Sequence, residues 1–581
     1  MDKRLKIGLL VDDPTIPLWA AEIVRKLEAD NCAEVTLVVQ NMLPGEPSQL
    51  RDSAHAPEGS LKATLLKIRR NASKLGFIAF SLLDSTFKPH SRSFDKPRDI
   101  AELLPNVPVI EVTPIKSLHS DTIVGNDLKN IRNADVDILF RIGFRILRGG
   151  ILQASRYGVW SYHHGDNLAM RGGPSGFWEL SSGAPVVGVV LQILNEDLDG
   201  GQILTRSWHL PDIILLNRQR QNVFMQALSH FPRQVKRLAT IGPDKFFEEV
   251  TKKNQHPCFY SKRLFVAPNN RLAIWTVGRL DLRYLCDKLI NLVTFRQWVL
   301  LTHYDHKSDS GLATSMWRYK QLVPPRDRCW ADPFVIERGG KFYAFVEELI
   351  FKKGRGHISV IELGTDGSFK DSIPVIEKPY HLSYPFLLEY QNEIYMIPES
   401  GDSGNVDVYR CTDFPEKWEL EKTLMTDVFA VDATLKEHNG RWWMFVTMRE
   451  NEGTNCLDEL HVYHADSPLS SDWQAHPLNP VSSDVRNARP AGSLFEHEGN
   501  LYRPAQNGSV RYGYGININH IEVLSETDYL ETCISSIKPD WDITLNATHT
   551  INHHSGFSVS DGSKLRFRYF KNILRGKTKI L

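Results

Sequence analysis

Cysteine is scarce in this chain of 581 residues and shows no pairing pattern. Its seven cysteines stand at positions 32, 258, 286, 329, 411, 456 and 533. Their number is odd and no C-x-x-C pair occurs, which argues against a disulfide framework and a cysteine-based zinc knuckle. We therefore expect a cytoplasmic protein.

Long apolar runs are also missing. The amino-terminal MDKRLKIGLLVDD contains an apolar run of only about five residues and no small-residue cleavage site, which favours a buried first strand over a signal peptide. The later stretch LINLVTFRQWVLL is interrupted by Arg296 and Gln297. No segment approaches the roughly 18 uninterrupted apolar residues of a membrane-spanning helix, so we expect no transmembrane segment.

An excess of charge of either sign is lacking as well. The 69 basic and 69 acidic side chains cancel, so the charge balance gives no reason to expect a nucleic-acid partner.

No G-x-G-x-x-G follows the first strand, which leaves a dinucleotide site without support. The histidine pairs at 163–164 and 553–554, and the segment 303–306, lack a complete ligand set, so we expect no metal.

The length predicts a multidomain protein with about three to four domain-sized units. Residues 1–215 alternate short apolar runs with amphipathic stretches, which is typical of an α/β Rossmann-like domain with a parallel sheet. Residues 216–292 begin with helical periodicity and are predicted to form a helical connector. Residues 293–581 are rich in aromatic residues, short strands and turns, and predict an all-β domain.

An internal repeat organises that last region. Each copy reads as a strand, a tight polar turn and an aromatic-rich strand, and the copies recur about every 50 to 65 residues. The copies begin at Ala331, Ser383, Val431, Ala488 and His553. Such a hairpin is the inner half of a propeller blade, so five copies predict a five-bladed β-propeller. The segment TFRQWVLLTHYDH before the first copy is suited to pair with the last blade.

Two short segments of the first domain bring a histidine and an aspartate to the ends of predicted strands. GVWSYHHGDNLAMR ends a buried strand at His163, and LNEDLDGGQIL carries Asp199. A neutral imidazole beside a carboxylate is suited to take a proton from an attacking amine. The alternative is a core histidine and a turn aspartate. His164 follows directly, and because neighbouring strand residues face opposite ways, only one of the two histidines can reach the site.

These motifs resemble the folate-dependent formyltransferases over about residues 3–210. The matching positions are Gly158, His163, Arg171, Gly172, Asp199, Gly201 and Ile203. The resemblance implies a formyltransferase that moves a formyl group from 10-formyltetrahydrofolate to an amine on a sugar or glycoconjugate. It implies that His163 takes the proton and that Asp199 holds the imidazole.

The same resemblance assigns further residues. The family's oxyanion-binding asparagine is Ser161 here, so Ser161, Asn167 or His164 would replace it, or the site would not do that chemistry. The expected cofactor-binding residues are Gly143, Ile146, Leu147 and Asp197. Arg171 and Gly172 are expected in a loop that closes over the acceptor, although they also suit a plain loop.

The repeat region resembles the five-bladed propellers of glycoside hydrolases that act on arabinans and fructans. Through CWADPFV and SYPFLLEY it is more similar to the propeller domain at the amino end of plant glucosamine inositolphosphorylceramide transferases. The resemblance covers about residues 295–570 and implies the fold more strongly than an activity.

The start of each inner strand would lie near the propeller axis. These positions are Asp332, Tyr384, Asp432, Arg489 and His554, and we expect them to bind carbohydrate. Two alternatives to formyl transfer stay open. Asp332 and Asp432, with Glu348 or Glu399, would work as a glycosidase pair in a glycan hydrolase or glycosyl-transfer enzyme beside a degenerate scaffold. Otherwise the protein binds glycans without catalysis.

The carboxyl-terminal KLRFRYFKNILRGKTKIL alternates apolar and basic residues from Lys564. Its first part predicts the last strand, and the remainder is suited to peripheral contact with an anionic membrane. The expected partner is an amino-sugar or glycoconjugate acceptor.

Overall fold

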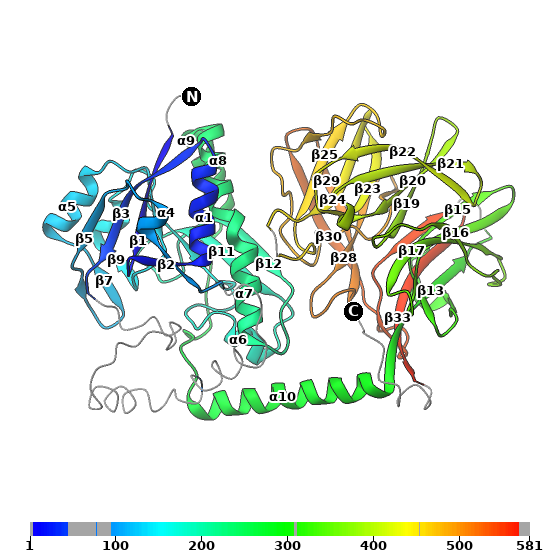
Figure 1. Ribbon diagram of the computed structural model, residues 1–581, viewed down its shortest axis with the longest axis horizontal. Coiled ribbons are helices and arrows are strands. Elements are labelled where there is room, and N and C mark those ends of the chain that lie inside the picture. Colours follow the sequence, from blue (N-terminus) through cyan, green and yellow to red (C-terminus); the bar gives the residue numbers. More distant parts are fainter. Residues whose placement is uncertain (1–3, 44–76, 78–93, 307–310, 452–453, 569–581) are drawn as a thin grey trace. The chain divides into compact units, whose positions relative to one another are not determined.

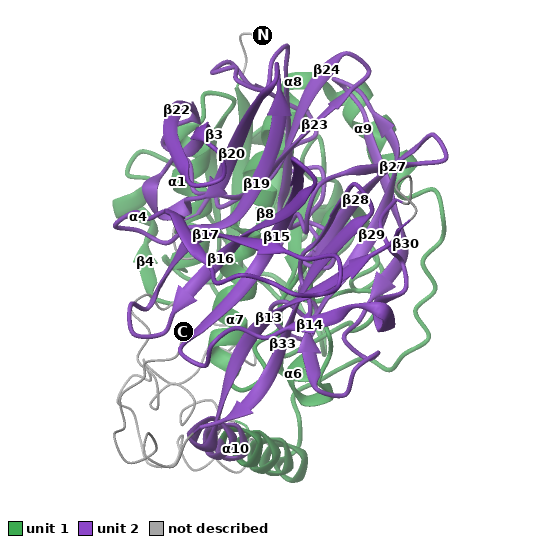
Figure 2. Cartoon of the chain, turned by 90° about the vertical axis from the view of Figure 1, so that its right-hand side faces the viewer, with its two compact units in different colours: residues 1–284 green, residues 285–581 purple. Residues whose placement is uncertain are grey.

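A computed structural model describes residues 4–43, 77, 94–306, 311–451 and 454–568. The chain divides into two compact units, Met1–Tyr284 and Leu285–Leu581, which Figure 2 shows in green and purple. The first is an α/β unit and the second is rich in β-strands, as the sequence predicts. The part of the predicted tail beyond residue 568 lies outside the described residues.

The amino-terminal unit is built on a seven-stranded mixed sheet with the order β12-β11-β10-β8-β1-β3-β5. The strands from β10 to β5 run parallel, whereas β11 and β12 add antiparallel pairs at one edge. Their bounds are β1 Leu5–Val11, β3 Ala33–Asn41, β5 Val109–Val112, β8 Ile138–Arg141, β10 Val159–His163, β11 Val187–Ile193 and β12 Gln202–His209. Short pairs flank the sheet: β2 Thr15–Pro17 with β4 Pro97–Asp99, and β7 Ser120–Thr122 with β6 Ile115–Lys116 and β9 Ile146–Arg148.

Alternation along the strands divides the core between the two faces of this sheet. Leu9 and Phe140 belong to one buried cluster, and their neighbours Leu10 and Leu139 belong to another. Helices α1 and α8 lie on one side and α5 on the other (Figure 1). The helices are α1 Leu18–Ala29, α4 Ile100–Leu103, α5 Gly125–Asn133, η2 Gly149–Gln153, α6 Phe177–Ser182, α7 Leu216–Gln226, η3 Ala227–Ser229, α8 His230–Ile241 and α9 Pro243–Lys253.

Much of the segment predicted as a connector takes part in this core. Val223 of α7, Phe231 of α8 and Phe246 of α9 are buried in the cluster that contains Trp160. The long helix α10, Asn270–Val293, then crosses the boundary between the two units. No helix in the described ranges is long and apolar enough to cross a membrane.

The described part of the carboxyl-terminal unit forms five antiparallel sheets. Four contain consecutive strands: β15–β18, β19–β22, β23–β26 and β27–β30. The fifth combines strands from both ends of the unit, because β13 pairs with β33 from Thr294↔Phe567 to Tyr304↔Phe557. The segment predicted to join the first and last parts of the unit therefore does so.

The strands of this unit have the following bounds. They are β13 Thr294–Tyr304, β14 Lys320–Leu322, β15 Arg328–Arg338, β16 Lys341–Ile350, β17 Arg355–Leu363, β18 Ile373–Ile376, β19 Ser383–Tyr390, β20 Glu393–Glu399, β21 Val406–Asp413, β22 Lys417–Met425, β23 Ala430–His438, β24 Arg441–Met448, β25 Leu460–Ala465, β26 Gln474–Ala475, β27 Phe495–His497, β28 Asn500–Asn507, β29 Gly515–Leu524, β30 Tyr529–Ile537, β31 Leu545–Ala547, β32 Ile551–His554 and β33 Phe557–Phe567. Two short 3-10 helices, η4 Met316–Arg318 and η5 Gly401–Ser403, lie between them.

Each of the five sequence repeats is a hairpin with the same turn. Two consecutive residues have positive φ in every copy: Gly339 and Gly340, Gln391 and Asn392, Asn439 and Gly440, Glu498 and Gly499, and Ser555 and Gly556. Two left-handed residues define the type I′ turn, whose twist matches that of the flanking strands. The polar turn of the repeat thus sets the hairpin register.

Candidate functional sites

The structure brings His163 and Asp199 together. His163 ends β10, and Asp199 lies in the loop between β11 and β12 with a φ of 52°. The Nδ1 atom of His163 lies 3.3 Å from Oδ1 of Asp199, and its Nε2 lies 2.9 Å from the Met170 carbonyl oxygen. Burial opposes protonation of His163, but the hydrogen bond and charge of Asp199 outweigh it and raise the histidine pKa. Asp199 therefore favours the protonated form of His163.

Ser161 lies beside Arg141, a residue that no sequence motif indicated as part of this site. Arg141, at the end of β8, donates from Nη1 to the Ser161 hydroxyl at 2.9 Å and from Nη2 to the Phe144 carbonyl at 3.1 Å. Burial lowers the pKa of Arg141, although the charge of Asp199 opposes this shift. The Ser161 oxygen is thus already engaged by a buried guanidinium.

His164 packs against aromatic side chains. Its ring stacks on Phe224 with centroids 3.6 Å apart, and burial keeps its pKa well below the usual value. Glu179 of α6 interacts instead with His163 by charge, and burial raises the Glu179 pKa to about 7. The sequence carried no motif for Glu179, because its role depends on how α6 is placed.

Residues 260–266, here named the covering segment, lie over the Arg171–Gly172 loop. Phe265 donates its amide to the Arg171 carbonyl at 2.9 Å, and its own carbonyl accepts from the Gly173 amide at 3.0 Å. The Tyr260 hydroxyl accepts from the Arg171 amide at 3.0 Å. The cavity that remains beside His163 has a volume of only about 10 Å³. The chain's own backbone therefore closes this site.

The four residues expected to bind a cofactor have separate structural roles. Gly143 lies against the backbone of Asp12, since an added Cβ would come within 2.4 Å of the Asp12 nitrogen. Ile146 and Leu147 are in β9, and Leu147 is buried in the core. The Asp197 amide donates to Asn195 Oδ1 in the exposed loop after β11.

A second site lies in the carboxyl-terminal unit, where three repeats share an unusual backbone. Asp332, Tyr384 and Asp432 have φ values of 49°, 42° and 56°. Each stands at a register shift in the first strand of its hairpin. Non-glycine residues in this conformation are costly and gather at functional sites. The same strain at three equivalent positions marks the site.

The partner strands add a second set of polar groups. Ala331, Ser383 and Val431 pair with Glu347, Glu399 and Thr447. In the two remaining repeats, the Gln506 amide donates to the Arg489 carbonyl and the His549 amide donates to Asp561. Together these residues form what we name the inner polar cluster: Asp332, Tyr384, Asp432, Arg489 and His549 on the first strands or beside them, and Glu347, Glu399, Thr447, Gln506 and Asp561 on the second.

Hydrogen bonds connect different repeats within this cluster. The Arg489 guanidinium pairs with both oxygens of Asp432, and Gln506 Nε2 donates to Asp432 at 3.0 Å. The Tyr384 hydroxyl accepts from the Gly492 amide at 2.8 Å. Asp561 Oδ2 lies 2.6 Å from His549 Nδ1 and accepts from the Asp332 amide at 3.1 Å.

Burial and neighbouring charges raise the pKa values of several groups in the cluster. Burial, followed by the charge of Asp332, raises the Glu347 pKa well above its usual value. Burial raises the Asp432 pKa to about 6, and the charge of Arg489 limits that rise. Burial opposes protonation of His549, but Asp561 and Asp332 raise its pKa to about 9. The raised pKa makes Glu347 a candidate proton donor in this cluster.

Of the predicted residues Glu399, Glu348 and His554, the structure places only Glu399 in the inner polar cluster. Glu399 lies in the inner polar cluster, but Glu348 points away from it and accepts from Trp330, Ser359 and Ser372. Those bonds outweigh burial and lower the Glu348 pKa. Its neighbour Glu347 faces the cluster, because adjacent strand residues face opposite sides. His554 accepts from the Glu337 amide, and His549 takes the place expected for it.

Among the residues that the structure describes, two groups offer metal-ligand atoms within 4.8 Å of one another: Asp332, His549 and Asp561, and Glu450, Glu459 and His461. In the first group, Asp561 accepts from the amides of Asp332 and His549, and the Thr550 hydroxyl donates to the Asp332 carboxylate at 2.5 Å.

Comparison with known proteins finds similarity in this unit. Residues 325–556 match the family model described as glucosamine inositolphosphorylceramide transferase 1, N-terminal. The transferase of that name from Oryza sativa subsp. japonica is 35% identical over 208 residues, and the one from Arabidopsis thaliana is 33% identical over 204 residues. The alignments cover 35% of this chain, but only 28% and 26% of those relatives. The predicted resemblance of the carboxyl-terminal half to this family is confirmed.

Solved structures give weaker likenesses. Glycinamide ribonucleotide transformylase 1 from Symbiobacterium toebii has a TM-score of 0.27 at 15% identity, covering 41% of this chain and 90% of that one. The family 117 glycoside hydrolase Zg3597 from Zobellia galactanivorans has a TM-score of 0.30 at 12% identity, covering 50% and 99%. Neither score is high enough to support a functional inference.

The prediction that the chain is a formyltransferase is wrong. The curated relatives are named glucosamine inositolphosphorylceramide transferases, and none of the three is a formyltransferase. Formyl transfer from a folate donor has no support from these relatives.

Proposed function

We propose that the carboxyl-terminal unit is a five-bladed propeller that acts in glycosyl transfer on a sugar conjugate, with the inner polar cluster as its site. The observation that carries this proposal is the repeated left-handed backbone at Asp332, Tyr384 and Asp432, which directs polar groups from successive hairpins into one cluster. The five repeat hairpins and the β13–β33 pairing support the propeller. The named relatives support a sugar conjugate as substrate.

The raised pKa of Glu347 suits proton donation at a glycosidic bond. In our proposal, Glu347 donates its proton to the leaving glycosidic oxygen, because burial favours its protonated form. Asp332 is the second carboxylate: it takes the proton of the acceptor hydroxyl as that oxygen attacks the anomeric carbon, so that the new C–O bond replaces the one that breaks. Asp432, which is bonded to Arg489 and Gln506, holds the Arg489 guanidinium in place to orient the sugar.

The exposed fractions of the Glu347 and Asp432 side chains agree with the roles proposed for them. The side chain of Glu347 is 15% exposed, whereas that of Asp432 is fully buried. Glu347 can therefore meet a substrate directly, and its carboxylate lies 3.4 Å from Nε2 of His381. Asp432 is placed to position Arg489, whose side chain is 13% exposed and can donate to sugar hydroxyls.

The test is turnover of a glucosaminyl glycolipid with an inositol phosphate headgroup by the full chain, followed by mass spectrometry. Glu347→Gln is expected to reduce the rate by about 100-fold to 10,000-fold, the usual contribution of a general acid. Asp332→Asn is expected to lose turnover as well. Glu389→Gln, an exposed carboxylate in the same unit, is the control. Unchanged turnover in Glu347→Gln would refute the assigned role.

A second candidate function is glycan binding without turnover, because the same cluster presents buried donors and acceptors in either case. If wild-type protein binds glucosamine in calorimetry but transforms no glycolipid, and Arg489→Met abolishes that binding, this candidate replaces the first.

A further inference from the structure

Helix α10 presents a wide apolar surface to solvent. Eight of its large apolar side chains are between 41% and 65% exposed: Ile274, Trp275, Leu282, Leu285, Leu289, Ile290, Leu292 and Val293. In a soluble protein, exposed apolar side chains are usually scattered, and a contiguous group marks an interaction site. We name this group the α10 stripe.

The spacing of the stripe places most of it on one helix face. Trp275, Leu282, Leu285, Leu289 and Leu292 follow one another at intervals of seven, three, four and three residues, which keeps side chains on a single face. The opposite face is held by the amino-terminal unit. There Ala273, Thr276 and Leu280 are buried, and the Thr276 hydroxyl lies 3.1 Å from that of Ser181.

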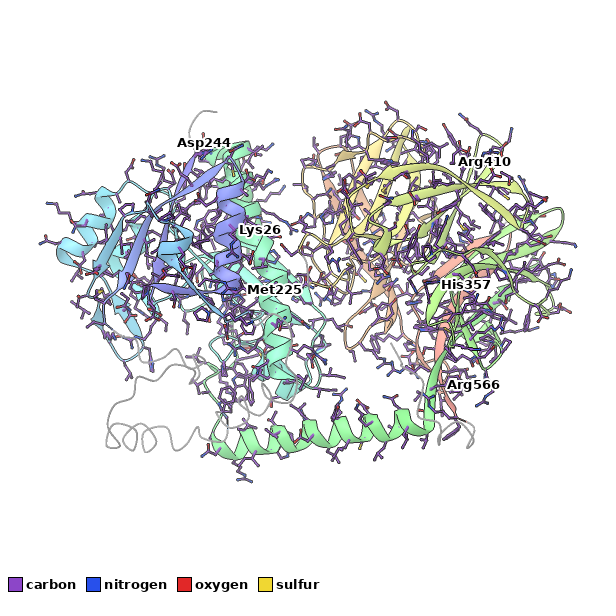
Figure 3. All side chains as sticks on the ribbon, in the orientation of Figure 1. Lys26, Met225, Asp244, His357, Arg410 and Arg566 are labelled. Atoms are coloured by element: carbon purple, nitrogen blue, oxygen red, sulfur yellow. The ribbon has the colours of Figure 1, made fainter. Side chains whose placement is uncertain are left out.

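Basic groups accompany the stripe. The helix carries Arg271, Arg279, Arg283 and Lys288 against two acids, Asp281 and Asp287. At its carboxyl end, Arg568 of the chain following β33 donates its amide to the Val293 carbonyl at 2.8 Å. Arg566 of β33 is labelled at that end of the helix in Figure 3. Between these two arginines, Phe567 is 75% exposed, so the apolar and basic character continues beyond the helix.

We propose that the α10 stripe binds the surface of an anionic phospholipid bilayer, with the helix lying parallel to the membrane. An interfacial helix combines an apolar face with bordering arginines and lysines, and it inserts only as far as the headgroup boundary. Trp275 suits that boundary, where indole rings are enriched. The helix is not apolar enough to span the bilayer.

The residues that flank the α10 stripe are better suited to contact a bilayer than to pair with α10 of a second copy of the chain. In a parallel pair of such helices, the flanking positions would set Asp281 against Cys286 and Lys288 against Val293 of the other copy. No ion pair would form there. Gly278 would occupy a seam position between Trp275 and Leu282 and leave a gap in the packing. Neither feature weakens insertion into lipid.

This interaction goes beyond the proposed glycosyl transfer and does not depend on it. The experiment is flotation of the full chain with vesicles of phosphatidylcholine alone, or with 30 mol% phosphatidylserine. These vesicles contain no glycolipid, so occupancy of the inner polar cluster has no effect on the result. Binding is expected with the anionic vesicles and is expected to weaken as salt rises.

The Leu285→Glu and Leu289→Glu double variant is expected to reduce vesicle partitioning by about tenfold or more, because two apolar anchors become charged. Ile543→Glu is the matched control, since Ile543 is 99% exposed and lies outside α10. Circular dichroism establishes that both variants fold. Retention of vesicle binding by the double variant would overturn the proposal. So would failure of the wild type to bind vesicles, together with a dimer in light scattering that the double variant dissociates.

Discussion

At the scale of single residues, the charge of Asp199 raises the His163 pKa against the lowering effect of burial. Asp199→Asn removes the charge but keeps the shape, so burial should then lower the His163 pKa toward or below its usual 6.5. A histidine NMR titration measures this shift. Asp197→Asn, in the exposed part of the same loop, should leave the His163 pKa unchanged. Equal pKa values in both variants would contradict the electrostatic explanation.

The same pair makes stability depend on pH in a defined window. The folded pKa of His163 is raised, so its contribution is complete below about pH 6.5 and is lost as pH rises through the folded value. The pKa of Asp199 is lowered, so its contribution is present above 3.8 and is lost as pH falls through its folded value. Stability of the wild type relative to Asp199→Asn, measured by denaturant unfolding, should therefore be greatest at weakly acidic pH.

Arg489 neutralises an aspartate that has no exposed surface. Arg489→Met should cost about 3 to 5 kcal/mol in the free energy of unfolding, because it leaves a buried charge without its partner. The double variant Arg489→Met with Asp432→Asn should recover part of that loss in urea unfolding. Additive losses from the two substitutions would show that the pair is not coupled.

At the scale of elements, Gly172 determines whether the covering segment can lie where it does. An added Cβ would stand 2.2 Å from the Phe265 carbonyl oxygen, and the φ of +94° is itself unfavourable for alanine. Gly172→Ala should therefore displace residues 260–266 and destabilise their docking by more than about 1 kcal/mol.

Hydrogen exchange at the Phe265 amide is the measurement for this prediction, because that amide donates to Arg171. Gly173→Ala is the control, since its added Cβ would meet nothing closer than 3.9 Å. Faster exchange is expected in Gly172→Ala alone. The same exchange rate in both variants would mean that the backbone bridge does not hold the segment.

At the scale of the whole molecule, the last strand holds both ends of the carboxyl-terminal unit together. β33 pairs with β13 along eleven residues and also with β31 and β32. A chain ending at Gly556 should therefore lose the cooperative thermal transition of this unit, as measured by calorimetry. A chain ending at Arg568 keeps every described strand and should retain the transition; its loss there would contradict this account.

Much of the architecture followed from local pattern. Alternating apolar runs predicted the α/β unit, and the repeated polar turns predicted the hairpins, because turn chemistry and strand periodicity act over a few residues. The local motif also predicted that His163 and Asp199 would meet. The sequence also predicted that Thr294–Tyr304 would pair with the last strand, because this strand-like segment precedes the first repeat.

Other features depended on contacts between distant residues. No motif indicated that Tyr260 and Phe265 would cover the loop at Gly172, or that Arg141 would engage Ser161. The choice between Glu347 and Glu348 rested on which face of β16 meets the register shift at Asp332. Sequence by itself determined the elements, the repeats and the polar residues available. Tertiary structure decided which of them meet, because burial and charge act between side chains that only folding brings together.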